Sequence, residues 1–125
     1  MSINNYEILD KKKIRWECCG KKIILKFEFP VEAYLVKHRD EVIVIADPRE
    51  AGINNIFVYS KDGSVRLRPK MPELSKPVNG VYSLIFQPNK DSFEVILDSD
   101  EFEPYDTGCM FDLDSGLFYD CHPSK

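Results

Sequence analysis

The stretch Glu41-Val42-Ile43-Val44-Ile45-Ala46 decides the fold class of this chain. After its first residue it is a continuous apolar run, and its length is that of a β-strand. The sequence 47–52 follows it and combines proline, glycine and charged residues, which is typical of a loop. We therefore expect residues 41–46 to form a central strand of a sheet.

Regular alternation predicts further strands on both sides of this run. Leu25, Phe27 and Phe29 alternate with charged side chains, which is the pattern of a half-buried strand over residues 22–29. Asp62-Gly63 separates two apolar segments, and this dipeptide is a strong hairpin signal because both residues tolerate positive φ. Hairpins are expected over residues 56–68, 81–97 and 109–121.

Helical periodicity is nearly absent from the sequence. Short helices are expected only within residues 1–10 and 48–51, and residues 32–38 suit either a strand or one helical turn. Eight or so short strands with turn chemistry between them predict a mainly β fold. We expect an antiparallel sheet that forms a small sandwich or a partly closed barrel. The length of 125 residues predicts a single domain over residues 1–125.

Composition and patterning limit the classes of protein. The chain is 43% hydrophobic and 30% charged, so it can build a core. No stretch approaches the roughly 18–20 apolar residues of a membrane span. The first residues lack the apolar segment of a secretory signal. We therefore expect a cytoplasmic protein with no membrane partner.

The four cysteines and two histidines give no recognisable metal or catalytic motif. Cys18 and Cys19 are adjacent, and Cys109 and Cys121 flank the last expected hairpin, where they could face each other. A cytoplasmic location favours reduced thiols. The spacings do not match a structural zinc site, so no metal and no cofactor are expected. A small enzyme that uses a Cys or His side chain stays as an alternative.

Charge is distributed very unevenly along the chain. Residues 1–90 carry 16 Lys and Arg against 11 Asp and Glu, whereas residues 91–125 carry one cation against ten carboxylates. The net charge of the whole chain is −4 and its pI is near 5.2. These values argue against direct binding of nucleic acid, because such domains are usually basic.

The densest acidic run, residues 98–106, carries two aromatic side chains among its carboxylates. It suits either a solvated loop that pairs with the basic part of the chain or a docking surface for a basic protein. In the second case the aromatic residues would be anchors inside a charged rim. The predicted partner-binding residues are Asp98, Asp100, Glu101, Phe102, Glu103, Tyr105, Asp106, Asp112 and Asp114.

Several motifs resemble a group of small bacterial β-sheet proteins. They are the segment 54–59, the Asp62-Gly63 turn, Tyr82, and the segment 112–116. Many of these proteins resemble the immunity proteins that accompany polymorphic or contact-dependent toxins, and the likeness covers residues 27–120. The resemblance implies a stoichiometric inhibitor that covers a toxin's active site, and it implies no catalytic residues.

Charge and resemblance lead to the same functional hypothesis. We expect a cytoplasmic immunity protein that neutralises a basic toxin domain, such as a nuclease, with its acidic surface. A nuclease must bind phosphates and is therefore basic at its active site. A structural or adaptor subunit of a larger assembly is the alternative from a different class.

Overall fold

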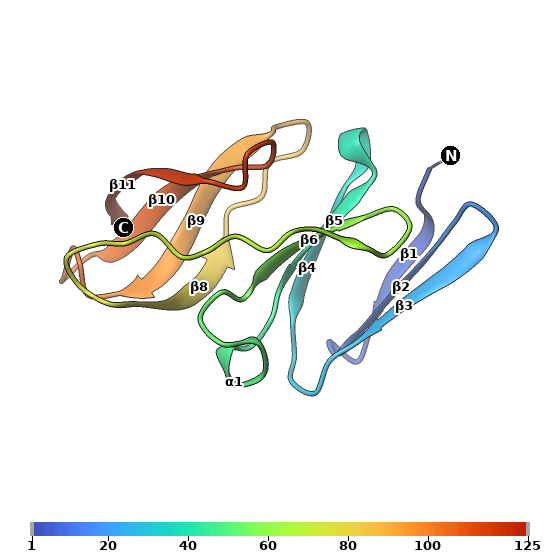
Figure 1. The fold of residues 1–125 in the computed structure, drawn as a ribbon, viewed down its shortest axis with the longest axis horizontal. Helices are drawn as coiled ribbons and strands as arrows, with labels where there is room; N and C mark the ends of the chain where they lie inside the picture. The colour runs from blue at the N-terminus through green and yellow to red at the C-terminus, as the bar shows by residue number, and fades with distance from the viewer. Residues whose placement is uncertain (1, 125) are drawn as a thin grey trace.

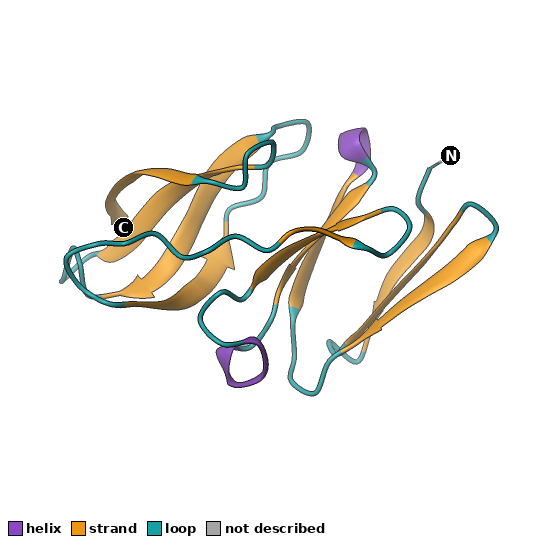
Figure 2. Ribbon diagram, viewed as in Figure 1, coloured by secondary structure: helices purple, strands orange, loops and turns teal. Residues whose placement is uncertain are grey.

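Three antiparallel sheets, stacked as layers, make up the fold in the computed structural model, which describes residues 2–124 (Figures 1 and 2). The first sheet contains β1 (Asn4–Leu9), β2 (Lys13–Cys18) and β3 (Lys21–Lys26). The second contains β4 (Glu32–Val36), β5 (Glu41–Ile45), β6 (Ile56–Ser60) and β7 (Val65–Leu67). The third contains β8 (Val78–Leu84), β9 (Ser92–Ser99), β10 (Asp106–Asp112) and β11 (Phe118–Ser124). Within each sheet every strand pairs with the next one along the chain.

The second sheet lies between the other two and is covered on both faces. All five residues of β5 are buried. Val42 and Val44 belong to the core shared with the first sheet, whereas Ile43 and Ile45 belong to the core shared with the third. A strand covered on both faces buries both of its alternating sets of side chains, which explains the continuous apolar run that follows Glu41.

The core between the first and second sheets is built around Trp16 of β2. Its side chain is 1% exposed and packs with Ile14, Val42 and Val44. Its indole nitrogen donates a hydrogen bond to the carbonyl oxygen of Lys61, at 2.7 Å, in the β6–β7 turn. The tryptophan therefore contributes both apolar burial and a polar link between the two layers.

The core between the second and third sheets contains a row of phenylalanine rings. Phe86, Phe93, Phe111 and Phe118 contact one another in that order, with ring centroids 5.9, 6.3 and 5.1 Å apart. Phe93 and Phe111 are fully buried. Because rings of this size remove roughly 150–250 Å² each from water, this row contributes a large share of the apolar burial.

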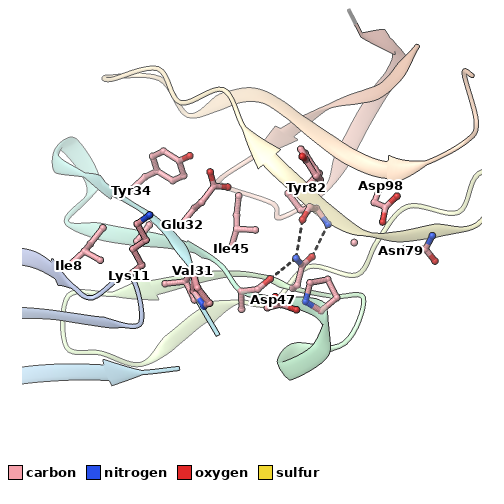
Figure 3. Close-up of a pocket in the computed structure, with 17 residues that line it drawn as sticks. Ile8, Lys11, Val31, Glu32, Tyr34, Ile45, Asp47, Asn79, Tyr82 and Asp98 are labelled. Carbon is pink, nitrogen blue, oxygen red and sulfur yellow. Dashed lines mark hydrogen bonds between the residues drawn. The ribbon is translucent and has the colours of Figure 1, made fainter. Parts of the chain in front are cut away.

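A fully buried side chain, that of Asn55, fastens the third sheet to the second. Its amide nitrogen donates to the carbonyl oxygens of Ala46, at 2.7 Å, and Val81, at 3.0 Å. Its amide oxygen accepts from the backbone nitrogen of Val81 at 2.7 Å (dashed lines in Figure 3). Gly80 has a φ of +131°, and a Cβ there would lie 2.9 Å from the Asn55 oxygen, so this position requires glycine.

The structure confirms the mainly β, antiparallel fold, and its three sheets do not close into a barrel. The short helix is confirmed as α1 (Pro48–Ala51), and residues 32–38 contain both alternatives, β4 and a 3₁₀ turn at Lys37–Arg39. The helix expected within residues 1–10 was wrong, because β1 occupies this region; Met1 lies outside the described residues. Within residues 2–124, no helix is long and apolar enough to cross a membrane.

The expectation of reduced thiols was wrong for one pair of cysteines. Cys109 and Cys121 form a disulfide between β10 and β11, with Cα atoms 4.0 Å apart. The register of this hairpin shifts between Gly108 and Met110, and Asp120 has a φ of 49°. The irregularity places Cys121 opposite Cys109. Cys18 and Cys19 are free.

The Asn55 link generates a test of how the layers are held together. Replacing Asn55 by alanine is expected to lower the free energy of unfolding by about 2–4 kcal/mol, because buried backbone groups lose partners at a cost of roughly 1–3 kcal/mol each. Urea denaturation measures this loss. The matched control is Asn79→Ala, because Asn79 is an exposed residue of β8. Equal stability of the two variants would contradict a stabilising role for the link.

Candidate functional site

The acidic run lies at one end of the third sheet. Asp98 is near the end of β9, residues 100–105 form the connecting loop, and Asp106 begins β10. Antiparallel pairing, in which Thr107 is opposite Leu97, brings the two flanks of the loop together. Buried Thr107 donates its hydroxyl to the carbonyl oxygen of Ser99 at 3.2 Å, which stabilises this end of the hairpin.

A groove of about 370 Å³ runs along this end of the sheet. We call it the acidic groove. Its walls contain four carboxylates and two exposed tyrosines, and none of the described residues that line it is a lysine or an arginine. Tyr82 of β8 is 74% exposed and Tyr105 of the loop is 50% exposed. The lining residues are Tyr82, Ile96, Leu97, Asp98, Ser99, Asp100, Glu103, Pro104, Tyr105 and Asp106.

Five of the nine predicted site residues therefore line one surface. They are Asp98, Asp100, Glu103, Tyr105 and Asp106. Ile96 also lines the groove and was not among the predicted site residues. Tyr82 was predicted only as part of the family resemblance, because the alternation of β8 is broken by two register shifts and does not reveal which side chains face outward.

Glu101 and Phe102 do not line the acidic groove. The Glu101 carboxylate accepts hydrogen bonds from the Ser75 hydroxyl, at 2.6 and 2.8 Å, and from the backbone nitrogen of Lys76 at 2.7 Å. These bonds, that from Ser75 foremost, hold the pKa of Glu101 below its ordinary value. Phe102 is partly buried. Glu101 thus anchors the long β7–β8 connection in this structure.

Asp112 and Asp114 lie at the opposite end of β10, where both carboxylates have hydrogen-bond partners within the fold. The Asp112 carboxylate accepts from the backbone nitrogen and the hydroxyl of Ser115 within the β10–β11 turn. Asp114 accepts from Arg39 at 2.8 Å. Arg39 also donates to Glu41 at 2.9 Å and to Asp91 at 3.1 Å. The structure therefore divides the predicted acidic surface into two ends. The carboxylates of the acidic groove have no ion-pair partner among the described residues, whereas Asp112 and Asp114 are bonded within the fold.

An ion pair crosses the exposed face of the third sheet beside the groove. His122 of β11 contacts the Glu94 carboxylate of β9, and Gly108 of β10 lies between them. A Cβ on Gly108 would lie 2.6 Å from the Glu94 oxygen, so a side chain there would displace the Glu94 carboxylate from this position. A hydrogen bond with the carbonyl oxygen of Asp120, followed by the contact with Glu94, raises the pKa of His122.

The four cysteines considered for metal binding or catalysis lie in two separate pairs. Within the described residues, no group of three His, Cys, Asp or Glu side chains is placed to hold a metal ion. Cys109 and Cys121 are bonded to each other. The thiols of Cys18 and Cys19 are 2.7 Å apart, and this contact raises the pKa of Cys18. A raised pKa makes a thiol a weaker nucleophile at neutral pH.

Comparisons with known proteins show the fold and no family. No protein-family model matches this chain, and no curated protein sequence matches it. A chain in the solved "Structure of Tne2 in complex with Tni2" is similar to it, with a TM-score of 0.65 and 13% sequence identity. The match covers 91% of this chain and 78% of that chain. At this identity the likeness shows a shared fold.

The His122–Glu94 pair predicts a pH-dependent contribution to stability. A His with a raised folded-state pKa stabilises fully below its ordinary value of 6.5, and this contribution disappears as the pH rises through the raised value. The difference in Tm between the wild type and His122→Gln should therefore be larger at pH 5.5 than at pH 8.5. Thermal unfolding followed by circular dichroism measures it. A difference that grows with pH would show that the pair does not stabilise through the charged imidazole.

Proposed function

We propose that this protein is an immunity-like binding protein that neutralises a basic partner, a toxin domain, by covering it with the acidic groove. The observation that carries the proposal is the coincidence of four unbalanced carboxylates with exposed Tyr82 and Tyr105 on one concave surface. The fold, shared with a chain from a complex of two proteins, is compatible with such a role. The motifs that resemble bacterial immunity proteins support the same assignment.

The arrangement suits fast recognition of a cationic surface. Carboxylates of one sign gathered around a groove attract a basic partner and orient it before contact. Tyrosines supply large, rigid, amphipathic contact areas, which is why they are frequent among the residues that dominate binding energy. Tyr82 projects from a strand and Tyr105 lies next to Pro104, so each is attached to a defined part of the fold.

Neutralisation by this site requires no catalytic reaction, because the groove occupies the basic active site of the toxin. An enzyme that acts on phosphate-containing substrates concentrates positive charge at its active site. A carboxylate groove competes for that charge and offers no bond that such an enzyme could cleave. Capture of the partner from the native cell would identify the toxin and, through it, the activity that is neutralised.

Reversing two charges of the acidic groove is expected to abolish most of the binding. The tagged wild type and the variant Asp100→Lys/Glu103→Lys would be used to capture proteins from lysate of the native cell at low and high salt. We expect one basic protein, identified by mass spectrometry, that high salt releases from the wild type. The variant should retain about tenfold less of it at low salt, because both attraction and orientation are lost.

The matched control reverses the same number of charges elsewhere. Glu28 and Glu73 are exposed, and neither side chain has a hydrogen bond or ion pair within the described residues. Glu28→Lys/Glu73→Lys should therefore capture the same protein as the wild type. Equal loss in both variants would indicate a net-charge effect, and full retention in the groove variant would overturn the proposed surface.

A further inference from the structure

A second hollow, of about 660 Å³, adjoins the acidic groove at the point where the three sheets meet. We call it the three-sheet pocket. It is lined by Ile8 of β1, Lys11 of the β1–β2 turn, β4, the end of β5, and β8. Figure 3 shows the lining side chains from these elements, with Tyr34 and Glu32 on one side and Tyr82 and Asp98 on the other. The volume lies within the roughly 300–1,000 Å³ that is usual for ligand clefts.

The pocket and the acidic groove are neighbours, because Tyr82 and Asp98 line both of them. A partner that covers the groove is therefore close to the pocket. The Asn55 link forms part of the pocket lining, so the cavity is built on one of the most firmly bonded parts of the fold.

The walls of the pocket combine apolar side chains with carboxylates. Val31 and Ile45 are buried apolar residues, and tyrosine rings come from β4 and β8. Glu32 and Asp98 are two of its three carboxylates; the third, Asp47, is already paired with Arg49 at 2.8 Å. Lys11 is the single cation among the lining residues.

Glu32 is a pocket carboxylate without a bonding partner among the described residues. It makes no hydrogen bond or ion pair with any residue in the range 2–124, Lys11 included. The neighbouring pocket wall removes enough water to raise its pKa above the ordinary value. Its charge is also felt by Tyr34, whose pKa is raised by burial and then by Glu32. A carboxylate in this situation gains from the arrival of a cation.

We infer that the three-sheet pocket receives an arginine side chain of the partner whose basic surface covers the acidic groove. This inference rests on the proposed function and specifies how the partner is recognised. A guanidinium group is planar, donates hydrogen bonds to carboxylates and stacks on aromatic rings. It is also less strongly hydrated than an ammonium group, so it enters a partly apolar cavity at lower cost. Glu32 and Tyr34, which lie on the same side of the pocket (Figure 3), provide a carboxylate acceptor and an aromatic ring.

A short peptide can serve as the probe for the pocket. We would titrate ¹⁵N-labelled protein with an acetylated, amidated lysine-glycine-arginine-glycine-lysine peptide and with a twin that carries citrulline in place of arginine. Citrulline keeps the shape of the side chain and removes its charge. We expect the arginine peptide to shift backbone amide signals of Ala33, Tyr34 and Gly80 together with those of the acidic groove. The citrulline peptide should lose the pocket shifts and bind about three- to tenfold more weakly, as expected for one charge-assisted contact.

The variant Glu32→Gln provides the second arm, with Glu28→Gln as its matched control. Both replace an exposed glutamate by its neutral isostere, and only Glu32 lines the pocket. Glu32→Gln should weaken the arginine peptide by a similar factor, and Glu28→Gln should leave it unchanged. An unchanged amide spectrum away from residue 32 confirms that the variant is folded.

The results separate the pocket from the proposed function. Shifts at the acidic groove without shifts at Ala33, Tyr34 and Gly80 would overturn the arginine site while the groove remains a cation-binding surface. Equal affinity for the arginine and citrulline peptides would also overturn it. Shifts at neither surface would overturn it as well, and the proposed function would still be judged by the capture of the partner.

Discussion

The requirement that one sheet be covered on both faces governs this structure. β5 is apolar at nearly every position, so neither of its faces can be left in water, and the chain supplies one further sheet on each side. The hydrophobic effect provides the driving force for this stacking, but it is not directional. Direction comes from a few polar contacts between layers, those of Trp16 with Lys61 and of Asn55 with Val81. Apolar burial therefore holds the layers together, and buried hydrogen bonds fix how they are aligned.

The sequence predicted the elements whose pattern depends on local contacts. Residues 41–46, the Asp62-Gly63 turn and the strand at Ser92 were recognisable because strand periodicity and turn chemistry act over a few residues. The first two strands were not predicted. In the first, residues 4–9 contain Asn4 and Asn5, which disfavour strands, and a bulge interrupts its pairing with the second. The number and stacking of the sheets could not be predicted, since they depend on packing between segments far apart in the sequence.

In the candidate site, too, local features could be predicted from the sequence and long-range contacts could not. The charge asymmetry was visible in the sequence, but the partners of each carboxylate were not. Glu101 belongs to the acidic run and nevertheless bonds to the β7–β8 connection, and Asp114 is paired with an arginine that is 75 residues away along the chain. Carboxylates that look alike in the sequence therefore differ in the structure, because some are bonded within the fold and others line the acidic groove. The useful quantity is the charge that remains after internal pairing, and four carboxylates without an ion-pair partner among the described residues lie around the β9–β10 loop.

The connectivity of the sheets has a consequence for how the protein reaches its native state. Every strand pairs with its sequence neighbour, so each sheet is completed by one uninterrupted segment of chain. Closing short connections costs little chain entropy, and proteins rich in local pairings fold faster than β-proteins whose strands pair across long separations. The three sheets can consequently form in order as the polypeptide emerges from the ribosome. The middle sheet gains its second cover only when the last segment, which carries the acidic groove, has been synthesised.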